Sequence, residues 1–327
     1  MEVLPPWLTK LKSFQRTTER MDRIRISKAQ VSLKRVGHIF LTQVKKDHIQ
    51  EKAASMAFNF TLSIFPLIIF LFTMIPYVPI PNLQQNIMGF LKDVMPKSIY
   101  MATEGTILEI ISIQQGGLLS FGFLLALYAA TSGVTSMIES FNKCYRTAET
   151  RGFFSRFFLS LTLIFIITIT MIIGITVGLA FSLYLDHLDA ILPFNDRLFY
   201  QIVLMLKYAI LFVIFWIIIS LIYYIAPNVI KRWRFLSIGS LVAAIMGVIF
   251  TGGFSFYIDN FNSYNKVYGS IGTFIGVLIW LFVISYVLLI GFEINASIDQ
   301  ATKEKLREVE RLLQKEAEKA DPNNPKI

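Results

Sequence analysis

The sequence predicts an all-α polytopic membrane protein with six transmembrane helices and both termini in the cytoplasm. Three observations lead to this fold class. Of the 327 residues, 54% are hydrophobic and 16% are charged, whereas soluble domains average about a quarter charged residues. The apolar residues gather in six runs, each long enough to cross a ~30 Å hydrocarbon core as a helix that rises ~1.5 Å per residue. Basic residues gather in alternate connections between these runs, as topology requires.

The six runs divide the chain into three parts. A helix satisfies its own backbone hydrogen bonds, as lipid demands, so each run is expected to form one spanning helix. A basic cytoplasmic arm is expected at 1–34, a six-helix membrane domain at 35–300, and a charged cytoplasmic helix with a disordered tail at 301–327. The expected spans lie at about 53–75, 118–138, 157–185, 203–226, 235–258 and 270–292.

The distribution of charge gives the orientation. Twelve Lys and Arg residues, against five acids, precede the first span. The second-to-third connection holds Lys143, Arg146, Arg151 and Arg156, whereas the long connection at 76–117 holds two lysines and three acids. Positive charge stays on the cytoplasmic side, so both termini are expected inside, in the bacterial inner membrane. The net charge of +9 then indicates attraction to anionic lipid headgroups rather than nucleic-acid binding.

Two segments outside the spans have helical patterns. Apolar residues at helical spacing in 76–117 predict two short amphipathic helices at the external interface, after prolines that end the first span. Leu306, Val309 and Leu313 form an apolar stripe in 301–319, which is expected to prolong the sixth helix into the cytoplasm. The first apolar run is too long for the hydrophobic part of a signal peptide, so no cleaved signal is expected.

Four stretches resemble the YihY/BrkB family of bacterial inner-membrane proteins, which was once labelled ribonuclease BN. They are AASMAFNFTLSIFPLIIF (53–70), ESFNKCYRTAETRGFFSRF (139–157), YYIAPNVIKRWRFLSIGS (223–240) and VYGSIGTFIGVLIWLFVISYVLLIGFEINA (267–296). The resemblance covers about residues 35–300 and implies a six-span inner-membrane protein. It implies no settled substrate, although transport, envelope lipids and virulence have been suggested for such proteins.

Glu293 closes the last span, and an ionisable group near a span is a candidate functional residue. If the span enters lipid near Ser270, Glu293 lies at the cytoplasmic interface and pairs with an Arg or Lys of the inner loops. In the alternative, Glu293 closes the inner mouth of a cavity, bonded to Asn295 or Arg151, and binds a cation or a proton.

Three further residues within the spans have two interpretations each. Lys207 either snorkels to the outer headgroups or turns inward to hold an anionic headgroup. Asn59 must face other helices, either as a link between helices or as the lining of a pathway. Pro66 removes one backbone hydrogen bond and is expected to kink the first span, which suits packing and gating alike.

Glycines and a cytoplasmic polar cluster complete the candidate sites. Small residues let helices approach closely, so the glycines of the fifth and sixth spans predict tight packing there or a hinge. An acid, an amide and guanidinium groups near the second span predict either a phosphate site, because the Arg fork matches phosphate oxygens, or a solvated basic loop. The glycines are Gly252, Gly253, Gly269, Gly272 and Gly276, and the polar cluster is Glu139, Asn142, Tyr145, Arg146 and Arg151.

No arrangement typical of catalysis is present in the sequence. The three histidines are His38, His48 and His187, Cys144 is the only cysteine, and no nucleophile–base, Walker or metal motif occurs. We therefore expect no enzyme, no cofactor and no metal, and the ribonuclease label has no support in these residues. The favoured hypothesis is a transporter or translocase for an anionic or amphipathic solute, such as an envelope lipid. The alternative is a membrane scaffold that recruits partners through its tails, and a homo-oligomer is compatible with both.

Overall fold

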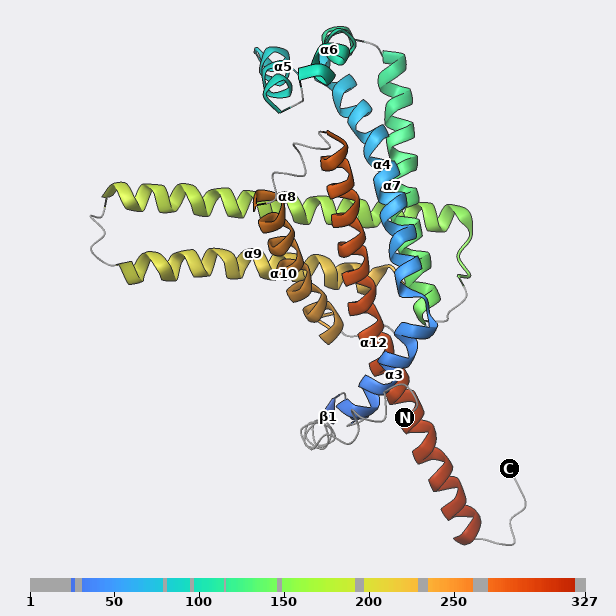
Figure 1. Cartoon of the computed structure of the whole chain (residues 1–327). Helices are drawn as coiled ribbons and strands as arrows, with labels where there is room; N and C mark the ends of the chain where they lie inside the picture. Colours follow the sequence, from blue (N-terminus) through green and yellow to red (C-terminus); the bar gives the residue numbers. More distant parts are fainter. Residues whose placement is uncertain are drawn as a thin grey trace.

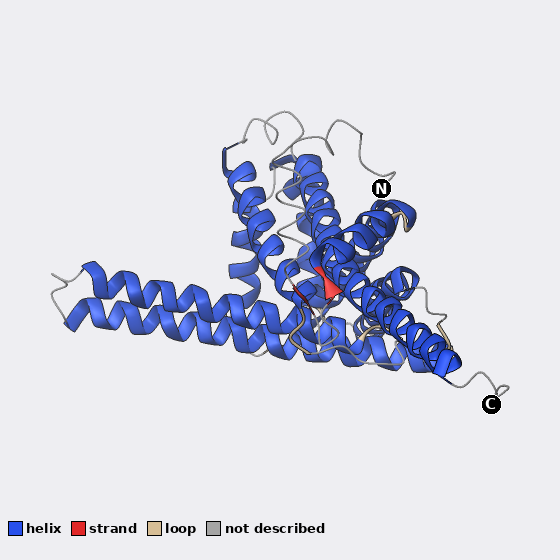
Figure 2. Cartoon of the chain, turned by 90° about the horizontal axis from the view of Figure 1, so that it is seen from below, coloured by secondary structure: helices blue, strands red, loops and turns tan. Residues whose placement is uncertain are grey.

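The computed structural model describes residues 25–26, 31–78, 81–94, 97–114, 116–145, 149–191, 197–228, 235–260 and 270–320. These residues are almost entirely helical (Figures 1 and 2). The elements, in chain order, are β1 (Arg25–Ile26), β2 (Val31–Ser32), α3 (Leu33–Lys46), α4 (Ile49–Met74), the short 3₁₀ helix η1 (Ile75–Tyr77), α5 (Leu83–Val94), α6 (Lys97–Ser112), α7 (Gly116–Tyr145), α8 (Phe153–Ile191), α9 (Arg197–Ile225), α10 (Ile238–Asn260) and α12 (Ser270–Ala320).

Five helices among the described residues are long and apolar enough to cross a membrane. They correspond to the first, second, third, fourth and sixth spans expected from the sequence. The fifth expected span forms α10, but its apolar part, Ile238–Phe254, is shorter than the other five. The all-α class and the membrane-type helices are thus confirmed. A sixth span and the orientation of the termini remain predictions.

The centre of the molecule is formed by α4, α7 and α12, which run in a similar direction (Figure 1). The helices α8 and α9 lie side by side and run at a steep angle to these three, as both cartoon views show. Their inner halves contribute Leu163, Ile219 and Ile222 to the same buried cluster that α4, α7, α10 and α12 form. The main core therefore lies where all six long helices meet.

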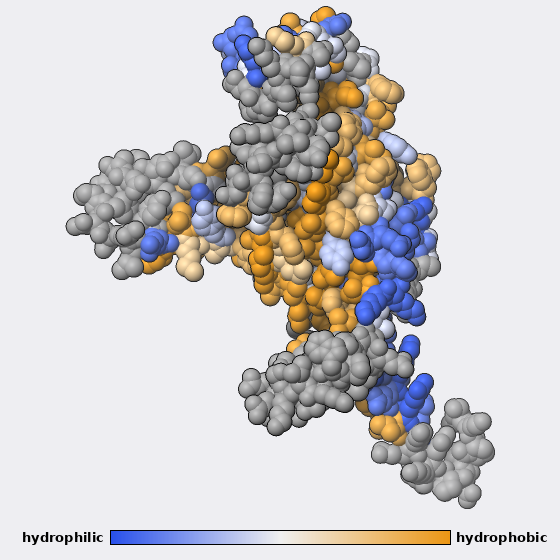
Figure 3. Space-filling model, in the orientation of Figure 1, coloured by the Kyte–Doolittle hydropathy of each residue, from blue (hydrophilic) through white to orange (hydrophobic). Residues whose placement is uncertain are grey.

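The outer surface of these helices is apolar. Figure 3 shows hydrophobic side chains over much of the middle of the molecule, with hydrophilic side chains toward its ends and along one side. A soluble protein rarely leaves a continuous patch of this extent exposed, so this surface is suited to contact lipid. Exposed members include Phe58, Phe65, Phe121, Phe165, Ile175, Met205, Ile249 and Phe256.

The helices α10 and α12 approach to backbone contact at Gly239 and Gly291. A Cβ atom at Gly239 would lie 2.0 Å from the Gly291 carbonyl oxygen, and one at Gly291 would lie 2.6 Å from the Ala243 Cβ. Tight packing or a hinge was expected from the sequence at other glycines of these two helices. A Cβ at Gly252 or Gly253 would meet no described atom within 4 Å, so the described residues give no sign of tight packing there, and the hinge remains a prediction.

The cytoplasmic end expected from the sequence contains more structure than a basic arm. The strands β1 and β2 pair antiparallel, with Arg25 opposite Ser32. The Ser32 hydroxyl then accepts a hydrogen bond from the Arg35 amide and caps α3. Ala301 packs among the buried side chains of β2 and α3, in a second small core. The helix α12 continues unbroken to Ala320, so the expected extension of the last helix is present.

The segment expected to form two outer amphipathic helices folds as η1, α5 and α6. Pro76 lies within η1, where the first long helix ends. Asn82, with φ of 58°, precedes α5, and asparagine tolerates this left-handed conformation better than most residues. The turn directs α5 and α6 away from the axis of α4, at one end of the molecule (Figure 1).

Candidate functional site

Glu293 is the one charged side chain among the described residues that has no exposed surface. Its neighbour Phe292 stacks on Phe141 of α7, with ring centroids 4.4 Å apart. Tyr223 of α9 meets both of these rings edge-on, at 5.6 and 5.7 Å. The carboxylate is therefore placed beside an aromatic core in which α7, α9 and α12 meet.

The thiol of Cys144, on α7, lies within electrostatic range of this carboxylate. The Lys52 ammonium lies 3.5 Å from the Cys144 sulfur, and the charges of Lys52, Glu293 and Asp47 all act on that thiol. Cys144 is itself 1% exposed. One basic group, two acids and a thiol thus gather where the lower ends of α4 and α7 meet α12. Charges in such a place are costly unless they are neutralised by pairing or by a proton.

Glu293 had two interpretations: an acid at the cytoplasmic interface paired with an Arg or Lys of the inner loops, or an acid at the inner mouth of a cavity bonded to Asn295 or Arg151. In the structure its side chain is enclosed by protein, and Arg151 binds Glu149. Asn295 is not its partner either, because residues two apart on a helix point to different faces. Asn295 faces α10, as its hydrogen bonds show.

Asn295 holds the beginning of α10. Its side-chain oxygen accepts a hydrogen bond from the Gly239 amide at 2.8 Å, and its side-chain nitrogen donates to the Ser237 hydroxyl at 2.7 Å. The Ser240 amide also donates to the Ser237 hydroxyl, at 3.2 Å. The Ser240 hydroxyl accepts from the Trp216 indole of α9, at 3.0 Å. This network joins α9, α10 and α12. It was not predicted from the sequence, although a serine before an apolar helix is a common N-cap signal.

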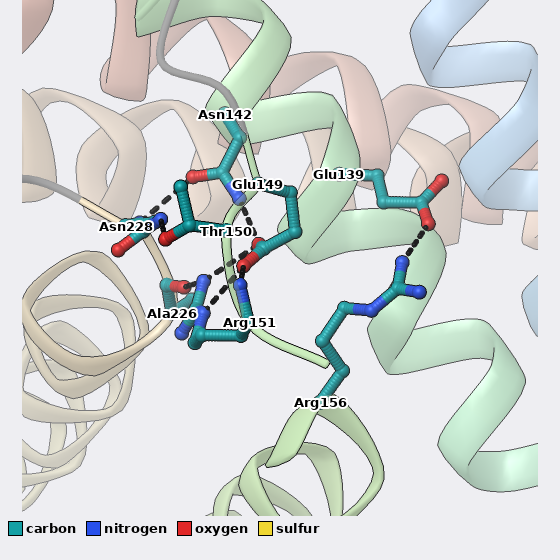
Figure 4. Close-up of polar contacts among 8 residues, drawn as sticks. All are labelled: Glu139, Asn142, Glu149, Thr150, Arg151, Arg156, Ala226 and Asn228. Atoms are coloured by element: carbon teal, nitrogen blue, oxygen red, sulfur yellow. Dashed lines mark hydrogen bonds and ion pairs between the residues drawn. The ribbon is translucent and has the colours of Figure 1, made fainter. Parts of the chain in front are cut away.

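The two loops after α7 and α9 are joined by hydrogen bonds among Asn142, Glu149, Arg151, Ala226 and Asn228, which we call the latch (Figure 4). The Arg151 guanidinium donates to both oxygens of Glu149, at 2.7 and 2.8 Å, and to the Ala226 carbonyl at 3.1 Å. Asn142 donates to Glu149 and accepts from the Asn228 amide at 2.8 Å. Burial raises the pKa of Glu149, but the hydrogen bonds and charge of Arg151 outweigh burial and hold this pKa below its ordinary value.

The polar cluster near the second span was expected to be either a phosphate site or a solvated basic loop, and its described members contact neighbouring parts of the chain. The Arg151 guanidinium is bound by Glu149, and Glu139 pairs with Arg156 at 3.0 Å. The Tyr145 hydroxyl donates to Asp299 of α12 and accepts from Lys303 at 2.7 Å. The contacts in Figure 4 link α7, α8 and the loops after α7 and α9 to one another. The contacts of Tyr145 join α7 to α12.

The candidate residues of the other spans occupy ordinary positions in their helices. The Asn59 amide donates to the Ser55 carbonyl at 2.9 Å and to the Ser136 hydroxyl of α7 at 3.1 Å, which is the expected link between helices. Pro66 lies within α4, which continues past it to Met74. Lys207 is half-buried on α9, and the two interpretations of Lys207 remain predictions.

Two of the expected candidates, Arg146 and Gly269, lie outside the described residues. Gly272 and Gly276 lie in the first turns of α12, and their role as a hinge remains a prediction. Within the described part of the chain, no group of three or more His, Cys, Asp and Glu side chains could hold a metal ion.

Residues 40–313 match the family model described as virulence factor BrkB. The chain is 32% identical over 257 residues to a protein of Bacillus subtilis (strain 168) named putative ribonuclease-like protein YfkH, covering 78% of this chain and 91% of the relative. It is 26% identical over 268 residues to a UPF0761 membrane protein of Psychromonas ingrahamii, covering 80% and 86%. A UPF0761 membrane protein of Haemophilus influenzae is 22% identical over 83% of this chain and 97% of the relative. No solved structure matches.

Proposed function

The chain belongs to the BrkB virulence factor family, and on this premise we propose that it is a transporter or translocase that moves an anionic, amphipathic solute across the bacterial inner membrane. The solute class that we propose is an envelope lipid or a lipid-linked precursor. The relatives of Psychromonas ingrahamii and Haemophilus influenzae are both named UPF0761 membrane protein, which supports a place in a membrane. We propose no enzymatic activity for it.

The observation on which this proposal depends is the buried carboxylate of Glu293. A charged group enclosed in a membrane helix is expensive, and such groups usually mark pathways for ions, protons or substrates. Glu293 has no exposed surface and lies within electrostatic range of Cys144, which the Lys52 ammonium contacts. In the proposed mechanism, Glu293 takes up and releases a proton as the helices around it rearrange, which couples the movement of the solute to the proton gradient.

Polar groups between the helices support a polar interior. Asn59 binds Ser136 between α4 and α7, and the hydroxyls of Thr135 and Ser160 lie 3.0 Å apart between α7 and α8. The Ser220 hydroxyl donates to that of Ser240 at 2.9 Å, between α9 and α10. These contacts link neighbouring helices through few and weak hydrogen bonds, which separate at low cost in a membrane. Such links suit a bundle that changes its packing.

The proposed topology has six spans and both termini in the cytoplasm. The 23 residues of α10 extend ~35 Å at ~1.5 Å per residue, which is sufficient to cross the bilayer. The basic connections lie at the cytoplasmic end, and α5 and α6 lie at the external interface. This topology requires α8 and α9, which run at a steep angle to α4 and α7 in the structure (Figure 1), to turn upright in the bilayer.

Reconstitution with a fluorescent anionic lipid tests the proposal. Proteoliposomes carrying tail-labelled phosphatidylglycerol are treated with dithionite, which bleaches only the outer leaflet unless lipid crosses the membrane. We expect bleaching beyond the outer-leaflet fraction with the wild-type protein, and a strong reduction with Glu293→Gln. The matched control is Glu308→Gln, because Glu308 is an exposed acid of the same helix, and its activity should equal that of the wild type.

Two results would contradict the proposal. The first is bleaching no greater than that of protein-free liposomes, with wild-type protein that elutes as one symmetric peak in detergent. The second is equal lipid movement by the wild type and Glu293→Gln, because the buried carboxylate would then have no part in it.

A further inference from the structure

The last helix is much longer than a membrane is thick. The 51 residues of α12 extend ~77 Å at ~1.5 Å per residue, whereas a hydrocarbon core is ~30 Å. The final third of α12 is rich in charge and projects away from the other long helices in Figure 1. This part of α12 therefore lies outside the bilayer, and its side chains make their contacts there.

One face of this extension is covered by α3. Ala301 is fully buried against β2 and α3. The Arg35 guanidinium of α3 pairs with Glu304 at 3.4 Å and with Glu308 at 3.1 Å. Residues 301, 304 and 308 share one face of a helix with ~3.6 residues per turn. The extension is thus anchored to its own chain along that face.

A different face carries an apolar stripe that the described residues leave exposed. Leu306, Val309 and Leu313 are 52%, 45% and 59% exposed. Their spacing of three and then four residues is that of alternating a and d positions in a heptad. At ~100° per residue the stripe lies about 140° around the helix from the face that α3 covers. Contact with α3 therefore does not bury it.

We propose that a second copy of this chain covers the stripe, in a parallel coiled coil of two α12 extensions. With Leu306 at a and Val309 at d, Lys305 occupies a g position and Glu310 the following e position. In a parallel pair, the g residue of one helix meets the e residue of the next heptad of its partner. Lys305 of each copy then meets Glu310 of the other, so the charges beside the stripe are complementary to those of an identical helix.

The membrane supplies the orientation and the local concentration that the short stripe needs. Two copies inserted with the same topology present their extensions parallel, on the same side, about a two-fold axis normal to the bilayer. A stripe of three apolar positions, little more than one heptad, is marginal on its own. Tethering raises its effective concentration and turns a weak contact into a stable one. Leucine at a with a β-branched residue at d also accommodates more than two helices.

The charge of the extension favours this partner over a lipid surface. Residues 301–320 hold six basic and five acidic side chains. Helices that lie on membranes have a strongly basic polar face instead. The near balance of charges is typical of helices that pair with one another through e and g contacts.

Disulfide cross-linking in native membranes tests the proposal. We expect Val309→Cys to form a covalent dimer under mild oxidation, because two d positions face each other. Arg311→Cys is the control, since residue 311 lies nearly opposite the stripe, and we expect no dimer from it. The wild type is the second control, because Cys144 is buried. Equal cross-linking at 309 and 311, or none at 309, would overturn the proposal, and lipid or another protein would then be the occupant.

Charge reversal separates the proposed pairing from a random collision. In the Val309→Cys background, Lys305→Glu alone and Glu310→Lys alone should each reduce the dimer several-fold, because like charges then meet across the pair. The double reversal should restore it. A double reversal that remains as weak as the single ones would overturn the parallel register.

Discussion

The carbonyl oxygen of Gly291 lies so close to Gly239 that a Cβ atom on Gly239 would be only 2.0 Å from it. The helices α10 and α12 therefore touch through their backbones, at the end of α10 that Asn295 caps. Real Cβ atoms do not approach other atoms this closely, so no other residue fits at this contact without moving a helix. The position of α10 against α12 depends on these two glycines.

We expect Gly291→Ala to destabilise the protein, by about 1–3 kcal/mol, as overpacking of a well-packed site does. A methyl group at Gly291 would lie 2.6 Å from Ala243 and from the Tyr223 hydroxyl. The measurement is the apparent melting temperature in mild detergent, read from the fraction that remains monodisperse after heating. Gly252→Ala is the matched control, because a Cβ there would meet no described atom within 4 Å. Equal melting of the two variants would contradict the backbone contact.

The latch between loops predicts a pH-dependent contribution to stability. Arg151 holds the pKa of Glu149 below its ordinary value of 4.5, despite the opposing effect of burial. A carboxyl whose pKa is lowered by folding stabilises the fold above its ordinary pKa, and this stabilisation is lost as the pH falls through the lowered value. We expect Glu149→Gln to cost about 1.5–3 kcal/mol at pH 7, as the loss of charged hydrogen bonds does.

Melting of the wild type and Glu149→Gln between pH 7 and pH 3 provides the measurement. Their difference in stability should shrink as the pH falls below 4.5. Glu139→Gln is the control, since the ion pair of Glu139 with Arg156 is more exposed and such pairs contribute about 0–1 kcal/mol. A difference between wild type and Glu149→Gln that stays constant over this pH range would disprove the ionic origin of the latch.

The length and apolarity of the runs made the helix interiors predictable. A run of about 20 apolar residues in lipid can only be a helix, and the described parts of α4, α7, α8, α9 and α12 contain the expected runs. The ends were less predictable. The run expected at 118–138 continues to Tyr145, because polar residues outside a span prolong a helix as readily as apolar ones.

The contacts between helices could not be predicted, because local spacing does not tell which helix a residue faces. Gly252 and Gly253 are adjacent small residues in an apolar run, yet Gly239 makes the close contact. Glu293 also has the same local pattern whether it faces solvent or protein. Its burial depends on how α12 packs against distant segments, of which Phe292 on Phe141 is one contact. The partner of Arg151, in contrast, lies two residues away and follows from the loop alone.

The hydrogen bond between Asn59 and Ser136 predicts energetic coupling between α4 and α7. The Asn59 amide divides its two N–H donors between the Ser55 carbonyl of its own helix and the Ser136 hydroxyl of the neighbouring one. Only the second bond is lost with Ser136→Ala. We expect a double-mutant cycle of Asn59→Ala and Ser136→Ala to give a coupling of about 0.6 kcal/mol, the average for such bonds in membranes, and at most ~1.7 kcal/mol.

Reversible unfolding in mixed micelles gives the four stabilities that this cycle requires. Pairing Asn59→Ala with Ser240→Ala gives a control cycle, because the bonds of Ser240 reach α9 and not α4 or α7. Distant sites without shared partners are additive, so the control coupling should be near zero. If the Asn59–Ser136 cycle were also additive, the amide would not hold the two helices together. The loss of a polar group in Asn59→Leu would then be expected to affect solute movement and not stability, as the lining of a pathway requires.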